Sequence, residues 1–362
     1  MNKIDRLISV DVFRGIIIAM MILVNYPGSW GYIYAPLTHS HWNGLTPTDF
    51  IFPFFIFIVG VSIALSYSKQ LAESKPKKEM VKKILIRGAK IYAIGFFLHY
   101  IPEFDFNKID LFGVLQRIAE VFVVCALLYL YTSWKTQIYI IAVILVGYWL
   151  TMTYIPTDAF IAGTSEPGVN FAAWVDRLIF PIETIGKHGW TAEGFYSCFP
   201  AIASGIIGML IGRFIVIRKT SENTIIWLVV AGVACIIAGT IWGWTFPINK
   251  KIWSSSFVLV TSGWAAIVLA LSLFLIDLQG YKNNLIAKFG VIFGSNAIAI
   301  YITADLFETT YKYTGIHDFV YLGLTNLGMT ELNASLIWSF VSVISCLLVG
   351  LILYRKQLFF KI

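Results

Sequence analysis

Charged residues are scarce in this sequence, and their scarcity excludes most classes of soluble protein. Asp, Glu, Lys and Arg together make up 13% of the 362 residues, whereas 58% are hydrophobic. The mean hydropathy is +0.77. A water-soluble domain could not cover this much apolar side chain with so few polar ones. The composition therefore predicts an integral membrane protein.

Cysteine is also rare, and its placement argues against a disulfide framework or a zinc site. The four cysteines lie in or beside apolar runs, and no two of them have C-x-x-C spacing. Disulfide-rich domains and structural zinc sites need clustered thiols. We therefore expect the cysteines to be packing residues, and we expect no bound metal.

Ten apolar runs are long enough to cross a membrane, which takes about 20 apolar residues per helix. No Gly/Ser-rich or Pro-rich linker separates them, and the longest intervening segment is 155–194. These features predict an all-α, polytopic membrane bundle of about ten transmembrane helices that forms a single domain over 1–362. The runs lie near 8–26, 48–67, 86–101, 113–132, 136–154, 195–217, 224–243, 255–276, 284–307 and 333–354.

Lys and Arg are nearly absent from every second loop between these runs. The segment 27–47 has neither residue, whereas 69–87 and the C-terminus are rich in both. Loops that carry Lys and Arg stay in the cytoplasm. We therefore predict that both termini are cytoplasmic and that 27–47 and 155–194 face outward. Because the basic residues follow this topology and no nucleic-acid-binding fold is visible, a nucleic acid is not an expected partner.

Few ionisable or amide side chains interrupt the apolar runs. A charge at the bilayer centre costs roughly 2.5 to 3.5 kcal/mol, so each such residue needs an explanation. Arg14 lies three residues after Asp11, and Arg117 three residues before Glu120, so each pair could be a structural ion pair on one helix. Asn25 ends the first run, where an amide can cap a helix. Structural and functional interpretations of these residues both remain open.

Two histidines, His39 and His41, stand where the second run begins. Aromatic residues surround them, as at many membrane interfaces. An interfacial belt explains the aromatic rings but does not require imidazoles. Histidine titrates at about pH 6.5 and can take up and return a proton, or carry an acyl group. The residues alone leave interfacial packing and catalysis as alternatives.

Six motifs then follow one another along nearly the whole chain. They are RLISVDVFRG (6–15), LVNYPGSW (23–30), HSHWNGLTPTDFIFPFFIFIVGVSI (39–63), GVLQRIA (113–119), FPINKKIWSSSFVLVTSG (246–263) and FGSNAIAIYI (293–302). In order and spacing they resemble the bacterial relatives of heparan-α-glucosaminide N-acetyltransferase. The resemblance implies a multi-helix enzyme that moves the acetyl group of cytosolic acetyl-CoA to the free amine of a glucosamine beyond the membrane.

The resemblance also assigns candidate catalytic residues. The active histidine of the family, in its H-x-x-W-N/H-G motif, falls on His39, and its partner asparagine falls on Asn25. The acidic motif W-D-P-E-G is changed here, because Glu193 is kept but Thr191 stands where the family has aspartate. This departure bears on the sugar contacts and on the identity of the acceptor.

The remaining expected roles concern the two substrates. For the acetyl-CoA phosphates we expect Arg14 and Arg117. Sugar binding on the outward side is expected to use an aromatic plane, amides and carboxylates, namely Trp42, Asn43, Asp49, Glu193 and Asn249. Membrane lipids are expected partners, a homodimer is left open, and the resemblance places the protein in a bacterial inner membrane.

Two other functions fit the same features. One is a transporter of amino sugars or muropeptides, although transporters usually bind substrate near the membrane midplane, whereas the reactive residues here gather at one face. The other is an O-acetyltransferase of exported glycans, which would form an ester in place of an amide.

Overall fold

The computed structural model describes residues 6–101, 111–156, 163, 165–181, 185 and 190–360. In these residues every regular element is helical and none is a strand, which confirms the predicted all-α class. The chain clusters into two compact units. The central unit comprises His41–Gly44 and Ile56–Leu271, and the terminal unit comprises Arg6–Ser40, Leu45–Phe55 and Ser272 to the C-terminus. A single domain over 1–362 stays a prediction.

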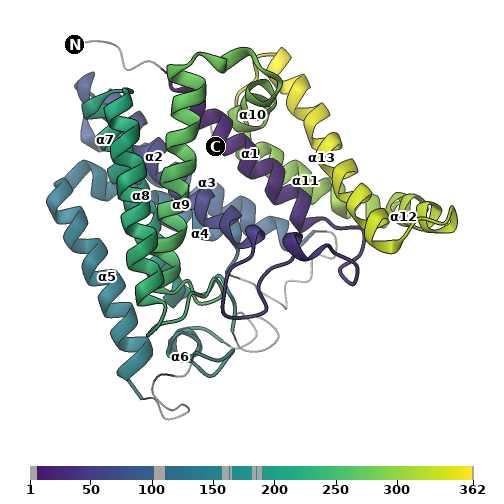
Figure 1. The fold of residues 1–362 in the computed structure, drawn as a ribbon, viewed down its shortest axis with the longest axis horizontal. Helices are drawn as coiled ribbons and strands as arrows, with labels where there is room; N and C mark the ends of the chain where they lie inside the picture. Colours follow the sequence, from purple (N-terminus) through teal and green to yellow (C-terminus); the bar gives the residue numbers. More distant parts are fainter. Residues whose placement is uncertain are drawn as a thin grey trace. The chain divides into compact units, whose positions relative to one another are not determined.

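The central unit is a bundle of mostly long helices joined by loops (Figure 1). Glycines allow some of its helices to touch through their backbones, as is common in membranes. A Cβ atom on Gly208 would lie 2.1 Å from the carbonyl oxygen of Phe57, and one on Gly60 would lie 2.0 Å from that of Gly205. The helices are α2 (Ile51–Ala72, its first turn grouped with the terminal unit), α3 (Lys77–Leu98), α4 (Val114–Tyr131), α5 (Trp134–Tyr154), α6 (Phe171–Ile179), α7 (Phe195–Arg218), α8 (Glu222–Trp242) and α9 (Ser255–Ser272).

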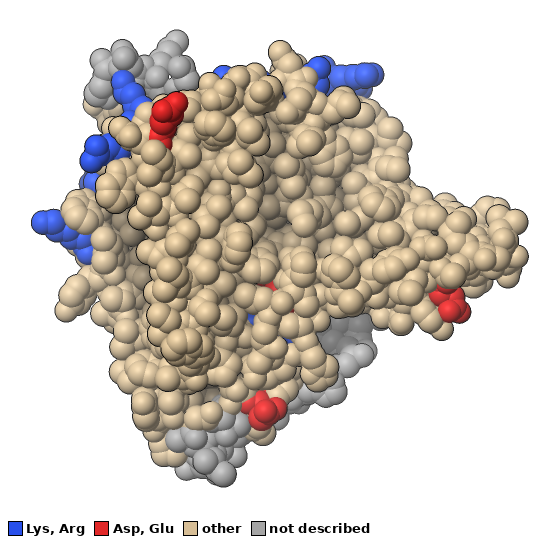
Figure 2. All heavy atoms as spheres, in the orientation of Figure 1, with Lys and Arg blue, Asp and Glu red and all other residues tan. Residues whose placement is uncertain are grey.

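The surface of the central unit is apolar along its outer helices. Over α5 and α8, Figure 2 shows few charged side chains, and Lys and Arg gather near the end where both helices begin. Val143 on α5 and Ile226 on α8 are 59% and 58% exposed. An apolar surface of this extent is expected to face lipid.

The terminal unit contains α1 (Ile8–Asn25), α10 (Leu285–Ser295), α11 (Ala297–Tyr313), α12 (Ile316–Asn326) and α13 (Glu331–Arg355). The Asp277 carboxylate begins α1 by accepting the backbone N–H groups of Ile8 and Ser9, at 3.3 and 3.2 Å. Farther along α1, Gly15 packs against α10, where an added Cβ would lie 1.8 Å from the Gly290 carbonyl oxygen. These contacts hold α1 against α10.

The helices agree with the predicted runs except at two places. Within the described ranges, eight helices are long and apolar enough to span a membrane, and the bent pair α10 and α11 would make nine. The predicted run 284–307 is bent by 82° between those two helices. Asn296 lies at the bend and bonds the C-terminal tail through the Leu358 carbonyl and the Phe360 N–H. The predicted run 86–101 lies mostly on α3, which carries six Lys and Arg residues and is not among the eight.

Candidate functional site

Asp49 organises the loop that carries His39 in the terminal unit. Its Oδ1 lies 2.7 Å from Nδ1 of His39. Its Oδ2 accepts the backbone N–H groups of Ser40 and Thr46, at 3.0 and 2.9 Å, and the Thr46 hydroxyl. Thr46 and Asp49 form a capping box at the short helix Pro47–Phe50. Local sequence therefore fixes the carboxylate, and the carboxylate fixes the histidine loop.

The His39–Asp49 pair suits proton transfer. The Asp49 side chain is completely buried, whereas that of His39 is 37% exposed. When Nδ1 carries the proton and donates it to Asp49, Nε2 presents a lone pair. A carboxylate in this position also stabilises the imidazolium that forms when the ring accepts a second proton. Direct contact between Asp49 and a sugar stays a prediction, because the described contacts of this carboxylate are to its own loop.

Asn25 is the last residue of α1 and is partly buried. The next residue, Tyr26, closes the helix by donating its N–H to Ile22, and its hydroxyl donates to Asp305. Within the described part of the terminal unit, no hydrogen bond joins Asn25 to His39. Their cooperation therefore stays a prediction.

Arg14 forms the ion pair that its spacing suggested. Its Nη1 lies 3.6 Å from Asp11, which also bonds Arg6 at 2.7 Å. Arg14 also donates to the Gly294 carbonyl at 3.4 Å. Its side chain is 23% exposed, so a phosphate could still approach it. That role stays a prediction.

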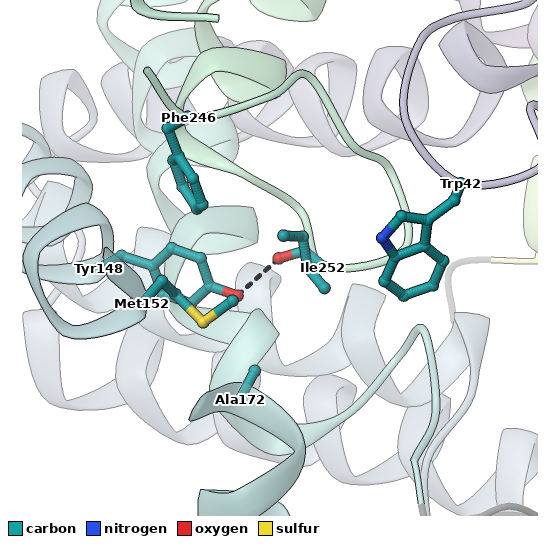
Figure 3. Close-up of a cluster of buried hydrophobic side chains, with 6 residues drawn as sticks. All are labelled: Trp42, Tyr148, Met152, Ala172, Phe246 and Ile252. Atoms are coloured by element: carbon teal, nitrogen blue, oxygen red, sulfur yellow. Dashed lines mark hydrogen bonds between the residues drawn. The ribbon is translucent and has the colours of Figure 1, made fainter. Parts of the chain in front are cut away.

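Trp42 belongs to an aromatic cluster in the central unit. Figure 3 shows Trp42 and Tyr148 on either side of Ile252, with the Tyr148 hydroxyl donating to the Ile252 carbonyl at 2.6 Å. The Trp42 ring meets Trp190 edge-on at 5.2 Å, and its indole N–H donates to Ser165 at 3.0 Å. Trp42 is only 9% exposed, so one edge of this ring at most is available to a ligand.

Asn43 and Asn249, two of the predicted sugar-binding residues, bond each other in the central unit. Their contact with a sugar stays a prediction. The Asn249 amide donates to the side-chain oxygen of Asn43 at 3.0 Å, and Gly44 donates its N–H to Ile248 at 2.8 Å. Asn249 is fully buried and also accepts the Ile252 N–H. Asn43 is exposed. The buried amide thus orients the exposed one.

Arg117 holds the turn that carries Glu193. Its guanidinium donates to the carbonyls of Ala192 and Gly194, at 3.1 and 2.9 Å, and to the Ser197 hydroxyl. It is 1% exposed and lies 5.2 Å from the Trp253 ring. Glu120, three residues after Arg117, accepts the Cys198 thiol at 2.9 Å and interacts with the charge of Arg117. Phosphate binding by Arg117 stays a prediction.

Thr191, which replaces the aspartate of the W-D-P-E-G motif, bonds within the turn that carries Glu193. The Thr191 hydroxyl accepts the backbone N–H of Glu193 at 3.4 Å. An aspartate side chain can make the same local bond, so threonine can replace it in shaping the turn. Glu193 is half-buried and remains a candidate for sugar binding.

Asp176 is a buried carboxylate that the sequence reasoning missed. It accepts the Tyr196 N–H at 2.8 Å, and its Oδ2 would lie 2.0 Å from a Cβ on Gly194. Burial raises the pKa of Asp176 to about 6, although the backbone N–H and nearby Arg117 favour the charged form. The available signal was helical spacing, because Asp176 shares a face of α6 with buried Ala172 and Ala173.

The cysteines behave as the sequence predicts for packing residues. All four are free of disulfides, and all except Cys235 are buried. Among the described residues, no group of three or more His, Cys, Asp or Glu side chains is arranged to hold a metal ion.

Comparison with known proteins identifies related sequences. A family model described as heparan-alpha-glucosaminide N-acetyltransferase, catalytic, matches residues 6–240. Heparan-alpha-glucosaminide N-acetyltransferase of Mus musculus is 25% identical over 419 positions, which cover 100% of this chain and 61% of the mouse protein. The Homo sapiens protein of that name is 26% identical over 416 positions, which cover 99% and 60% of the two chains. The chain thus spans about three fifths of the length of these relatives.

Proposed function

The chain belongs to the heparan-alpha-glucosaminide N-acetyltransferase catalytic family, and from this premise we propose that it moves an acetyl group from acetyl-CoA to the free amine of a glucosamine-type sugar. The observation that carries the proposal is the His39–Asp49 pair, a half-exposed imidazole oriented by a buried carboxylate. The pair lies within the segment that the family model matches.

The reaction requires one proton to move. The sugar amine attacks the thioester carbonyl as the free base, the C–N bond forms and the C–S bond breaks. Nε2 of His39 takes the proton that the amine loses and returns it to the departing CoA thiolate, while Asp49 steadies the imidazolium. The products are an N-acetylated sugar and CoA with a free thiol.

A second route proceeds through acetylated His39. In that route the imidazole attacks the thioester first, CoA leaves, and the amine then takes the acetyl group from the ring. Asn25 serves either route as a hydrogen-bond donor to the oxygen that becomes negative. In other enzymes, deleting such a donor raises the activation barrier by roughly 3 to 4 kcal/mol.

Sugar recognition falls to residues of the central unit in this proposal. Asn43 is exposed, and Asn249 already orients its side chain, so bonding a sugar hydroxyl costs little further side-chain entropy. Trp42 offers a ring edge, and Glu193 a carboxylate on a turn fixed by Arg117. In the terminal unit, Asp49 shapes the loop that carries His39.

Donor binding and sidedness complete the proposal. Arg14, near the start of α1, favours the negative phosphates of acetyl-CoA. We place both termini and the donor in the cytoplasm and the acceptor beyond the membrane, which for a bacterial chain is the inner membrane. The distribution of Lys and Arg among the loops supports this orientation.

Purified protein given acetyl-CoA and glucosamine tests the proposal directly. We expect free CoA and N-acetylglucosamine in equal amounts, measured by a thiol reagent and by mass spectrometry. A transporter of amino sugars would produce neither. An O-acetyltransferase would give an ester that mild alkali cleaves, and either result would overturn the proposal.

A further inference from the structure

Helix α6 is short and almost entirely apolar, with Asp176 and Arg177 as its only charged residues. It follows α5 and precedes α7 in the chain, and both of these are able to span a membrane. One side of α6 packs inward, because Ala172, Ala173 and Asp176 are buried. The Asp176 carboxylate accepts the N–H of Tyr196 in the first turn of α7 at 2.8 Å. This contact fixes α6 against the start of α7.

The opposite side of α6 is apolar and uncovered. Leu178 follows Asp176 by two residues, which places it on nearly the opposite side of the helix. It is 65% exposed, and the adjacent Ile179 is 52% exposed. The Arg177 guanidinium donates to the Gly168 carbonyl, in the loop before α6, at 2.7 Å. The exposed end of the helix therefore presents branched hydrocarbon side chains.

Phe180, the residue after α6, fixes the depth of these side chains. Its ring meets Phe112 edge-on at 4.9 Å and Phe195 at 5.9 Å, measured between ring centroids. Phe112 lies two residues before α4, and Phe195 is the first residue of α7. Both helices are apolar enough to span a membrane, so their starts mark one membrane surface. Figure 1 shows α6 at the end of the central unit where α5 finishes.

Exposed phenylalanines connect the end of α6 with the outer surface of α7. The rings of Phe195 and Phe199 meet edge-on at 5.7 Å and are 37% and 42% exposed. Through Phe180, this aromatic row adjoins Ile179. Aromatic side chains are enriched where spanning helices pass the membrane–water interface. The apolar end of α6 thus continues the surface with which α7 enters the membrane.

We propose that α6 lies in the interfacial layer of the bilayer, with the side chains of Leu178 and Ile179 inserted among lipid acyl chains just below the head groups. Helices of this kind bury their apolar side by about 5 to 10 Å. Asp176 also lies against Gly194, where an added Cβ would be 2.0 Å from its Oδ2. Helix α6 therefore holds the turn that carries Glu193 at the membrane surface.

Fluorescence quenching in nanodiscs that each hold one copy of the chain tests the depth of α6. A bimane label is attached to Leu178→Cys in a Cys235→Ser background, which lacks the one cysteine that is not buried. Glu166→Cys, exposed in the loop before α6, is the matched control for water. Val143→Cys, at the middle of α5 and 59% exposed, is the control for hydrocarbon.

The label at Leu178→Cys should be quenched more strongly by lipids with a nitroxide near the head group than by lipids with a nitroxide at the chain end. We expect the reverse order at Val143→Cys, and quenching by aqueous iodide alone at Glu166→Cys. Ile179→Cys, at a second position on the same surface, should show the same order as Leu178→Cys. These readouts do not involve turnover, so they stand or fall independently of the proposed acetyl transfer.

Three results would overturn the proposal. Iodide quenching at Leu178→Cys as strong as at Glu166→Cys would place α6 in water. A quenching order like that of Val143→Cys would place α6 deep in the hydrocarbon instead of at the interface. Protection from iodide and from both nitroxide lipids would show that protein, rather than lipid, covers this side of the helix.

Discussion

Two buried charged side chains each organise a loop, one in each unit, and they do so for different ends. In the terminal unit, one carboxylate oxygen of Asp49 accepts hydrogen bonds from backbone and hydroxyl donors. The other oxygen contacts His39, a side chain that can change its protonation. In the central unit Arg117 bonds two backbone carbonyls and the Ser197 hydroxyl, and none of these partners titrates near neutral pH. The first arrangement is suited to the proton transfer of the proposed reaction, and the second fixes the shape of a turn. Substitutions at the two residues should therefore differ in kind.

Removing the imidazole should have the largest effect. We expect His39→Ala to lower the rate of CoA release by roughly 10²- to 10⁴-fold, because the general base is lost. His41→Ala is the matched control, since it removes the same ring two positions away, and it should retain nearly normal activity. Equal losses in the two variants would show that this part of the loop needs rings rather than a base.

Removing the guanidinium should affect folding first. Arg117→Met leaves the carbonyls of Ala192 and Gly194 without their donor inside the protein, which should lower the free energy of unfolding by about 3 kcal/mol. Thermal unfolding in detergent, followed by circular dichroism, measures the loss. Arg117→Lys keeps the charge but not the fork of donors, so it should recover only part of the stability. Unchanged unfolding would contradict the structural role given to Arg117.

Neutralising Asp49 should affect catalysis more than folding. Asp49→Asn keeps an oxygen for the backbone N–H groups of the loop but loses the charge that stabilises the imidazolium. We expect kcat to fall by about 10- to 100-fold, with a smaller change in unfolding temperature than for Arg117→Met. If Asp49→Asn lowered the unfolding temperature more than Arg117→Met, the catalytic role given to Asp49 and the structural role given to Arg117 would both be contradicted.

The smallest effect should come from Asp176 as a dependence of stability on pH. Its pKa is raised to about 6 in the folded protein, so between its ordinary value and that pH the folded state binds the proton more tightly. The contribution of this residue to the unfolding free energy therefore falls as the pH rises through that window, by about 2 kcal/mol from about pH 4.5 to 7.5. Asp176→Asn, which keeps an acceptor for the Tyr196 N–H, should remove that dependence.

Paired unfolding curves measure the effect at Asp176. The difference between the wild type and Asp176→Asn should change across this pH range, and it should stay constant above about pH 7. Glu222→Gln, at an exposed glutamate in the first turn of α8, controls for the general effect of losing one carboxylate. A difference that is independent of pH would contradict the raised pKa.

Much of the fold could be predicted because hydropathy is a local property. Eight predicted runs are helices able to span a membrane, and the all-α class follows from them. The run at 284–307 contained no signal for an 82° bend, because the bend depends on Asn296 bonding a tail more than 60 residues away. The run at 86–101 lies on a longer helix that begins at Lys77. The Lys77 ammonium donates to the Leu130 carbonyl of α4, a contact that the hydropathy of 86–101 does not report.

The candidate site divides in the same way. Asp49 lies three residues after Thr46, so its capping box, and with it the histidine loop, is built from neighbours in the sequence. The partners of Arg117 lie 75 to 80 residues away, and the donor to Asp176 lies 20 residues away on another helix. The sequence by itself determined a helical membrane protein and gave His39, in the loop before the second span, as its candidate catalytic residue. Only the tertiary structure decided the roles of Arg117 and Asp176, because their contacts join distant segments that meet only when the helices pack.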